Sequence, residues 1–139
     1  MTIHVGEEGG EYGIAEIREV VSTLRPDRIG HGILAARDRR LMGQISEAGI
    51  VLEICPTSNL LTKALAGEEA LRDTFRAFAD CDVQFTIATD GPEMMRTHLR
   101  DEFELLLRIS ALDESQVSEA NRRGHEASFV RAYSVTQTV

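Results

Sequence analysis

Histidine and acidic residues recur in this sequence directly after short apolar runs, where such side chains could bind a metal ion or transfer protons. His4 and Glu7 follow the first run, His31 ends the second, and Asp90 follows the fourth. Imidazole and carboxylate groups are ligands that zinc and other divalent transition ions prefer. A further carboxyl group beside them, such as Glu7, is available as an acid or base. The residue types therefore indicate a metal centre with an acid–base group next to it.

The apolar runs that precede these residues are short and rich in β-branched residues, which predicts strands at 2–5, 28–30, 50–54 and 83–88. Between them lie amphipathic stretches with helical spacing, at 13–24, 37–48 and 68–79. This alternation predicts an α/β fold in which parallel strands are joined by right-handed crossovers. Because parallel strands end at the same edge of a sheet, we expect the reactive residues to meet there.

After the fourth strand the pattern contains helices alone, predicted at 99–112, 115–123 and 125–133, followed by a frayed tail over 134–139. Since the chain has 139 residues, one domain is the upper bound.

Composition excludes several classes of function. Fifteen Lys and Arg against 23 Asp and Glu give a net charge of -8, which disfavours nucleic acid and anionic lipid as partners. No apolar run approaches the roughly 20 residues of a membrane helix, and no secretory signal is recognisable at the start, so we predict a cytoplasmic protein. Cys55 and Cys81 form no C-x-x-C pair, and we predict that both are reduced.

Each reactive residue also has an ordinary structural interpretation. A lone His4 beside a strand is more often part of a hydrogen-bonded structure than a ligand, Glu7 is compatible with a solvated loop, and Asp90 before Gly91 and Pro92 is typical of a turn. Ser58 and Asn59 are equally compatible with capping the following turn and with a place in the site. The functional interpretation depends on the coincidence of such residues at consecutive strand ends.

Four ordered segments of the sequence resemble the second half of the adenosine deaminase family, over residues 2 to about 133. They are His4-Val5-Gly6-Glu7, Arg28-Ile29-Gly30-His31-Gly32, Leu52-Glu53-Ile54-Cys55-Pro56-Thr57-Ser58-Asn59, and Thr89-Asp90 with Pro92. Members of this family are (β/α)₈ barrels in which one zinc ion activates water to replace the 6-amino group of adenosine, giving inosine and ammonia. The resemblance implies that residues 1–139 are a single half-barrel domain, the C-terminal half of a TIM barrel, with four parallel βα units and C-terminal helices.

The resemblance also implies a role for each site residue. His4 and Asp90 would be zinc ligands, and Asp90 would also contact the hydroxide. Glu7 would protonate the purine ring nitrogen next to the attacked carbon. His31 would orient the hydroxide and take part in its deprotonation, while Gly6 would let the backbone approach the base.

Two departures from the family pattern bear on function. Gly91 stands where the family has a second aspartate that hydrogen-bonds the imidazole side of the purine, so adenine, an adenosine-like nucleoside and a modified purine nucleoside all remain open. The family's H-x-H pair, which supplies two further zinc ligands, has no counterpart in this sequence. We therefore expect the isolated chain to bind zinc weakly and to be inactive without a complementary N-terminal half or self-association into a homo-oligomer. The alternative is a non-catalytic half-barrel that self-associates or binds another subunit.

A third interpretation, a small flavodoxin-like binder of nucleotides or phosphate, requires a glycine-rich loop that opens a helix. The candidate loop at 6–10 contains Glu7 and Glu8, which repel phosphate.

Overall fold

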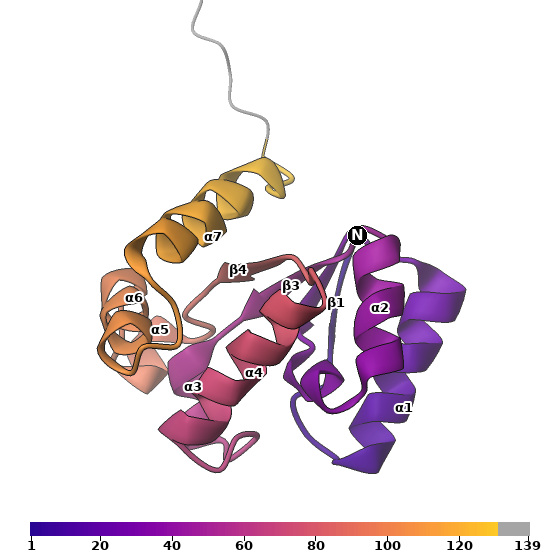
Figure 1. Ribbon diagram of the computed structural model, residues 1–139, viewed down its shortest axis with the longest axis horizontal. Helices are drawn as coiled ribbons and strands as arrows, with labels where there is room; N and C mark the ends of the chain where they lie inside the picture. The colour runs from indigo at the N-terminus through magenta and orange to yellow at the C-terminus, as the bar shows by residue number, and fades with distance from the viewer. Residues whose placement is uncertain (131–139) are drawn as a thin grey trace, which may run out of the picture.

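Residues 1–130 are described by a computed structural model, and they form one parallel sheet with helices (Figure 1). The four strands lie in chain order, as the sequence predicts: β1 (Thr2–Val5), β2 (Arg28–His31), β3 (Val51–Ile54) and β4 (Phe85–Ile87). The observed strands begin or end one or two residues away from some predicted limits. The α/β prediction is therefore confirmed at the level of elements and of strand direction.

The strands are aligned so that their carboxyl ends reach one edge. His4 pairs with Gly30, Gly30 pairs with Glu53, and Glu53 pairs with Thr86 across the three parallel ladders. The segments that follow the four strands therefore leave the sheet side by side.

One face of the sheet is covered by helices that contribute the core (Figure 1). Ile29, Leu52 and Ile54 are fully buried on the sheet, and Phe75 and Phe78 of the covering layer are fully buried as well. Phe75 meets Phe85 of β4 edge to face, with ring centroids 5.0 Å apart. The covering helices are α1 (Glu11–Glu19), its π-helical continuation η1 (Val20–Leu24), the 3₁₀ segment η2 (Ile33–Arg37), α2 (Arg39–Glu47) and α4 (Glu68–Asp80).

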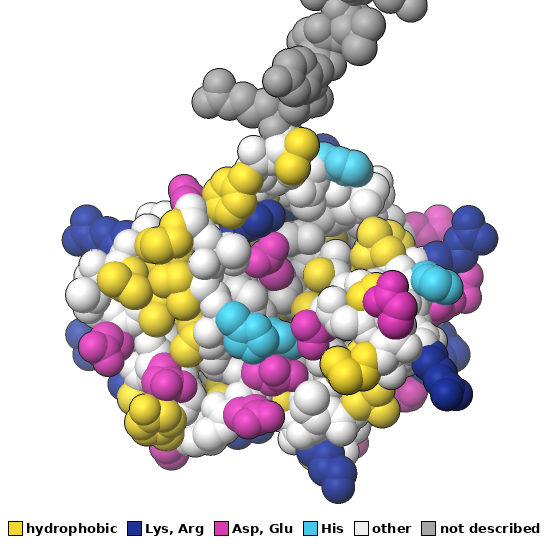
Figure 2. All heavy atoms as spheres, turned by 180° about the vertical axis from the view of Figure 1, so that it is seen from behind, with side chains coloured by type: hydrophobic (Ala, Val, Ile, Leu, Met, Phe, Trp, Pro, Cys, Tyr) yellow, Lys and Arg dark blue, Asp and Glu magenta, His cyan; other side chains and the backbone are white. Residues whose placement is uncertain are grey.

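The opposite face of the sheet carries polar side chains, because residues alternate between the two faces of a strand. Arg28 Nη1 lies 3.3 Å from Glu53 Oε1, and Thr2 Oγ1 donates a hydrogen bond of 2.8 Å to Glu53 Oε2. Figure 2 shows this face as a hollow with histidine and acidic side chains at its centre.

Two short helices that come after strands were not predicted: α3 (Pro56–Leu61) after β3 and α5 (Pro92–Met95) a few residues after β4. Each begins at a proline in its first turn, a position where the missing N–H costs no hydrogen bond. With six residues in α3 and four in α5, both helices are too short to show an amphipathic period in the sequence.

The last described helices are α6 (Leu99–Arg108) and α7 (Glu114–Glu126), and here the predictions need correction. The predicted helix over 99–112 ends earlier, where Ser110 adopts a left-handed backbone conformation with φ of 55°. The predicted break before His125 does not occur, because α7 runs through Gly124. A Cβ at Gly124 would lie 3.2 Å from Thr86 Oγ1, so the glycine permits close packing on β4. Residues 127–130 are not helical, and the rest of the predicted 125–133 helix and the tail lie outside the described residues.

Among residues 1–130, no helix has both the length and the apolar character required to cross a membrane. The cytoplasmic location stays a prediction.

Asp38 caps α2, which predicts a pH-dependent contribution to stability. Its Oδ1 accepts the N–H groups of Arg40 (3.0 Å) and Leu41 (3.1 Å), and its Oδ2 accepts from Arg18 (2.6 Å). The hydrogen bond from Leu41, followed by that from Arg18, lowers the pKa of Asp38 in the folded state. We expect D38A to lower the free energy of unfolding by about 1 kcal/mol at pH 7.

This contribution is present above the ordinary carboxyl pKa of about 3.9 and is lost as the pH falls through the lower folded-state pKa. Urea denaturation at pH 7 and near pH 3 measures it. The matched control is D73A, because Asp73 is exposed and, among residues 1–130, pairs with Arg76 alone, one turn along the same helix. An equal decrease in the free energy of unfolding of D38A and D73A at pH 7 would contradict the assignment of Asp38 as a helix cap.

Candidate functional site

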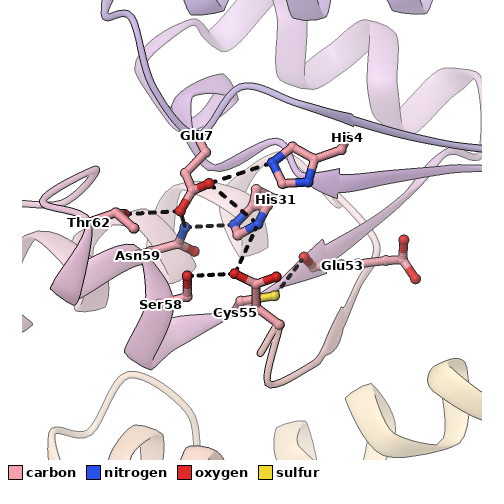
Figure 3. A network of polar contacts seen from close by, with 9 residues as sticks. His4, Glu7, His31, Glu53, Cys55, Ser58, Asn59 and Thr62 are labelled. Atoms are coloured by element: carbon pink, nitrogen blue, oxygen red, sulfur yellow. Dashed lines mark hydrogen bonds and ion pairs between the residues drawn. The ribbon is translucent and has the colours of Figure 1, made fainter. Parts of the chain in front are cut away.

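The structure brings His4, Glu7 and His31 together at the carboxyl edge of the sheet (Figure 3), and Asp90 lies beside His31. Glu7 Oε2 lies 3.5 Å from His4 Nε2 and 3.6 Å from His31 Nε2. Asp90 Oδ2 lies 4.0 Å from the same His31 nitrogen. The rings of His4 and His31 are tilted against each other with centroids 4.6 Å apart. Groups that follow β1 and β4 therefore face His31 Nε2 at the end of β2.

The backbone turns sharply where these residues leave the strands. His31 and Asp90 adopt left-handed conformations with φ of 60° and 61°, which residues with a Cβ rarely do. Such conformations cost about 1–3 kcal/mol each and cluster at functional sites. They direct both side chains to the edge of the sheet.

Gly6 also lies at a turn, with φ of 76°. A Cβ at this position would lie 2.3 Å from Ile17 Cδ1 and 3.3 Å from Gly32 Cα, so backbone geometry and packing require glycine here. Its predicted role in letting the backbone approach a purine stays a prediction.

The four side chains differ in their exposure to solvent. His31 is 2% exposed, Glu7 12%, Asp90 38% and His4 65%. Burial is the main cause that lowers the pKa of His31, and the neighbouring carboxylate of Glu7 opposes this shift. Burial therefore favours the neutral imidazole.

Helix α3 supplies a set of supporting hydrogen bonds. Ser58 Oγ donates to Asp90 Oδ2 at 2.9 Å, the Asn59 side-chain amide contacts His31 Nδ1 at 2.8 Å, and Thr62 just beyond the helix donates to Glu7 Oε1 at 3.0 Å. Ser58 and Asn59 are fully buried. Of the two interpretations of Ser58 and Asn59, the structure thus favours a place in the site.

The position of α3 is fixed by a buried acid that sequence reasoning missed. Glu102 of α6 is fully buried; its Oε2 accepts the N–H of Thr57 at 2.9 Å and its Oε1 accepts from Thr97 at 3.0 Å. The first of these bonds satisfies a free N–H in the first turn of α3. In the sequence, Glu102 is one of several acids on an amphipathic helix, and nothing distinguishes it.

The donor atoms fit a divalent transition ion. His4, Glu7 and His31 each offer a ligand atom, and these atoms lie within 4.8 Å of one another. Ligands of a tetrahedral zinc ion lie about 3.4 Å apart, given metal–ligand bonds of about 2.1 Å. Two imidazoles and a carboxylate in this range are donor types that suit zinc, and Asp90 offers a second carboxylate 4.0 Å from His31 Nε2.

Cys55 borders the site, but its chemistry is that of an inert thiol. Both cysteines are free, with Cys55 buried and Cys81 half-buried. Burial, with the negative charges of Asp90 and Glu102 adding to it, raises the pKa of Cys55 to about 12. The thiol therefore stays protonated at neutral pH and is a poor nucleophile.

The fold and the site define the class of protein: parallel βα units with histidine and carboxylate groups at the carboxyl edge of the strands. The family model for adenosine deaminase matches residues 1–137. This chain belongs to the adenosine deaminase family, as the sequence motifs predict.

Curated relatives include an aminodeoxyfutalosine deaminase of Streptomyces coelicolor, 37% identical over 131 residues, or 93% of this chain and 32% of that protein. An adenine deaminase of Rhizobium johnstonii is 34% identical over 130 residues, which cover 94% of this chain and 39% of that protein. The chain thus spans about a third of the length of these relatives.

Solved structures agree on the fold. The adenine deaminase of Arthrobacter aurescens matches with a TM-score of 0.81 at 22% identity, over 94% of this chain and 38% of that chain. The N6-methyl-AMP deaminase of Arabidopsis thaliana matches with a TM-score of 0.76 at 25% identity, over 94% of this chain and 36% of that chain. The predicted fold class, part of a TIM barrel, is confirmed. The extent of a single half-barrel domain over 1–139 stays a prediction.

The raised pKa of Cys55 predicts selective thiol reactivity. At pH 8 we expect a thiol reagent to modify Cys81 in the native chain and to leave Cys55 unmodified, because Cys55 is both buried and protonated. In C81S we expect no reaction until urea unfolds the chain, after which one thiol reacts. Spectrophotometric thiol titration measures both states. Rapid modification of native C81S would contradict the buried, protonated assignment.

Proposed function

We propose that this chain carries the C-terminal part of the active site of a hydrolytic deaminase acting on a 6-aminopurine. The observation that supports the proposal best is the convergence of His4, Glu7 and Asp90 around His31 at the carboxyl edge of the sheet. Membership of the adenosine deaminase family adds the reaction class, in which water replaces the amino group and ammonia is released.

In this proposal, His4 and Asp90 are the zinc ligands. Bound there, zinc would supply a Lewis acid that lowers the pKa of water from about 15.7 to about 7. Two protein ligands are fewer than the three or more typical of catalytic zinc sites. Further ligands must therefore come from a complementary N-terminal half, and the isolated chain is expected to bind zinc weakly.

Glu7 and His31 carry the proton chemistry. Glu7 is largely buried and receives a hydrogen bond from Thr62 on one carboxyl oxygen, which leaves the other free to deliver a proton to a purine ring nitrogen. His31 faces the same oxygen and Asp90. As a hydrogen-bond donor through Nε2, it orients the attacking water and takes part in its deprotonation by stabilising the hydroxide that forms. Ser58 holds Asp90 by its hydrogen bond.

The substrate class follows from the relatives and from one sequence departure. The relatives named above are deaminases of adenine and of aminodeoxyfutalosine. Gly91 places no side-chain hydrogen-bonding group beside Asp90. We therefore propose adenine, adenosine (converted to inosine) or a related purine nucleoside as the substrate.

A second candidate is a non-catalytic half-barrel that self-associates or binds another subunit. The open polar face supports it, since Thr2 and His4 of β1 are exposed there and β1 and β4 form the edges of the sheet. Exposed strand edges favour pairing with another chain. Light scattering on the purified chain distinguishes a monomer from a homo-oligomer.

Complementation tests the enzymatic proposal. We expect the chain alone to release no ammonia from adenine or adenosine and to hold little zinc. When it is co-expressed with the N-terminal half of the Rhizobium johnstonii adenine deaminase, we expect ammonia release and about one zinc per assembled pair. Assembly of the two halves with zinc bound but no turnover on any 6-aminopurine would refute the deaminase proposal.

Variants of the assembled pair separate ligands from proton-transfer groups. E7Q keeps the size of the side chain but cannot deliver a proton, so we expect kcat to fall by about 10²–10⁴ with zinc content unchanged. H31A should abolish turnover and leave zinc content largely intact, whereas D90A should lower both. Elemental analysis beside the ammonia assay measures the two properties. Loss of zinc in H31A with zinc retained in D90A would reverse the assignments.

A further inference from the structure

Asn59 occupies a fixed position beside Glu7 and His31, the two residues proposed for the proton chemistry. Its side chain is fully buried. Its backbone N–H donates to the Cys55 carbonyl at 2.9 Å, and its carbonyl accepts the Leu65 N–H at 3.1 Å. The side-chain amide therefore has a well-defined place beside His31 and Glu7 (Figure 3).

The amide nitrogen of Asn59 contacts two acceptors. Nδ2 lies 2.8 Å from His31 Nδ1 and, at the limit of a hydrogen bond, 3.5 Å from Glu7 Oε1. An amide NH₂ group donates two hydrogens and accepts none. The reversed amide would place its oxygen 3.5 Å from a carboxylate oxygen, with no hydrogen between them. The contact with Glu7 therefore favours the orientation in which Asn59 donates, and in that orientation the same nitrogen faces His31 Nδ1.

A donor at Nδ1 determines where the neutral imidazole of His31 carries its proton. Nδ1 accepts from Asn59 through its lone pair, so the ring proton must lie on Nε2. That N–H faces Glu7 Oε2 at 3.6 Å and Asp90 Oδ2 at 4.0 Å. A protonated ring nitrogen has no lone pair for a metal ion.

Asn59 Oδ1 is buried and has no hydrogen-bond partner among the described residues. A buried unsatisfied oxygen destabilises a fold, so the amide makes a poor structural filler at this position. The contacts that the Asn59 side chain does make are those of Nδ2 with His31 and Glu7.

We propose that Asn59 is a positioning residue that fixes the tautomer of His31. It holds the ring proton on Nε2, directs that N–H between Glu7 and Asp90, and so keeps His31 out of the metal ligand set although its Nε2 lies within ligand distance of its neighbours. The tautomer is a property of this chain, while its consequence for turnover rests on the proposed deaminase function.

Nitrogen NMR of the 139-residue chain tests the tautomer directly. With ¹⁵N-labelled protein at pH 8 and a chelator present, we expect His31 Nε2 to show the shift of a protonated ring nitrogen and Nδ1 that of an unprotonated one. In N59D the carboxylate only accepts, so the pattern should reverse. In N59A the donor is missing, and intermediate shifts at both nitrogens are expected.

The matched control is T62V, which removes the other hydrogen bond to Glu7 Oε1 and leaves the Asn59–His31 contact in place. We expect the His31 pattern of T62V to equal that of the wild type. Backbone spectra report whether each variant is folded. Protonation of Nδ1 in the wild type overturns the proposal by itself, without any variant, and so does an unchanged pattern in folded N59D or N59A.

A second readout concerns turnover in the assembled pair. Loss of a residue that orients a site group typically lowers activity or metal affinity by about 10–100-fold. For N59A we expect kcat to fall by that factor, with KM and zinc content close to those of the wild type. A fall in zinc content equal to that of D90A would make His31 a ligand and overturn the proposal. If the assembled, zinc-loaded pair has no turnover on any 6-aminopurine, the deaminase proposal fails, but the NMR result on the tautomer stands.

Discussion

The alignment of four parallel strands is the constraint on which the rest of the structure depends. The ladders place His4, Gly30, Glu53 and Thr86 in one row across the sheet, so the chain segments after the strands leave at the same level. His31 and Asp90, which are 59 positions apart in sequence, thereby lie 4.0 Å apart. A shift of one residue in any strand would direct its side chains to the other face of the sheet.

A buried polar network around the reactive residues holds them in position. Left-handed conformations at His31 and Asp90 are costly, and they persist because the surroundings determine them. Helix α3 provides these surroundings through Ser58 and Asn59, and Glu102 fixes α3 in turn. Such a network rigidifies the strand ends and orients the groups that face the hollow of the sheet.

The open polar face supports the proposal that the chain forms part of a larger assembly. Arg28 and Glu53 pair across it, and histidine and acidic groups line its centre. Helices α1, α2 and α4 cover the other face, and α7 packs against the polar face at Thr86 of β4. The family relationship fits this proposal. The relatives are about three times as long as the region that they share with this chain, so they contain further sequence for the rest of a barrel. Catalysis as proposed needs that completion, because this chain supplies only part of the ligand set.

The sequence by itself determined the four strands, the main helices and the identity of the reactive residues at the strand ends. These follow from local periods of hydrophobicity and from residue types, which need no knowledge of distant contacts. Only the tertiary structure decided the contacts of Asn59 and Glu102, because their partners lie 28 and 45 residues away in sequence. It also decided the continuity of α7 through Gly124, since close packing on Thr86 outweighs the low helix propensity of glycine.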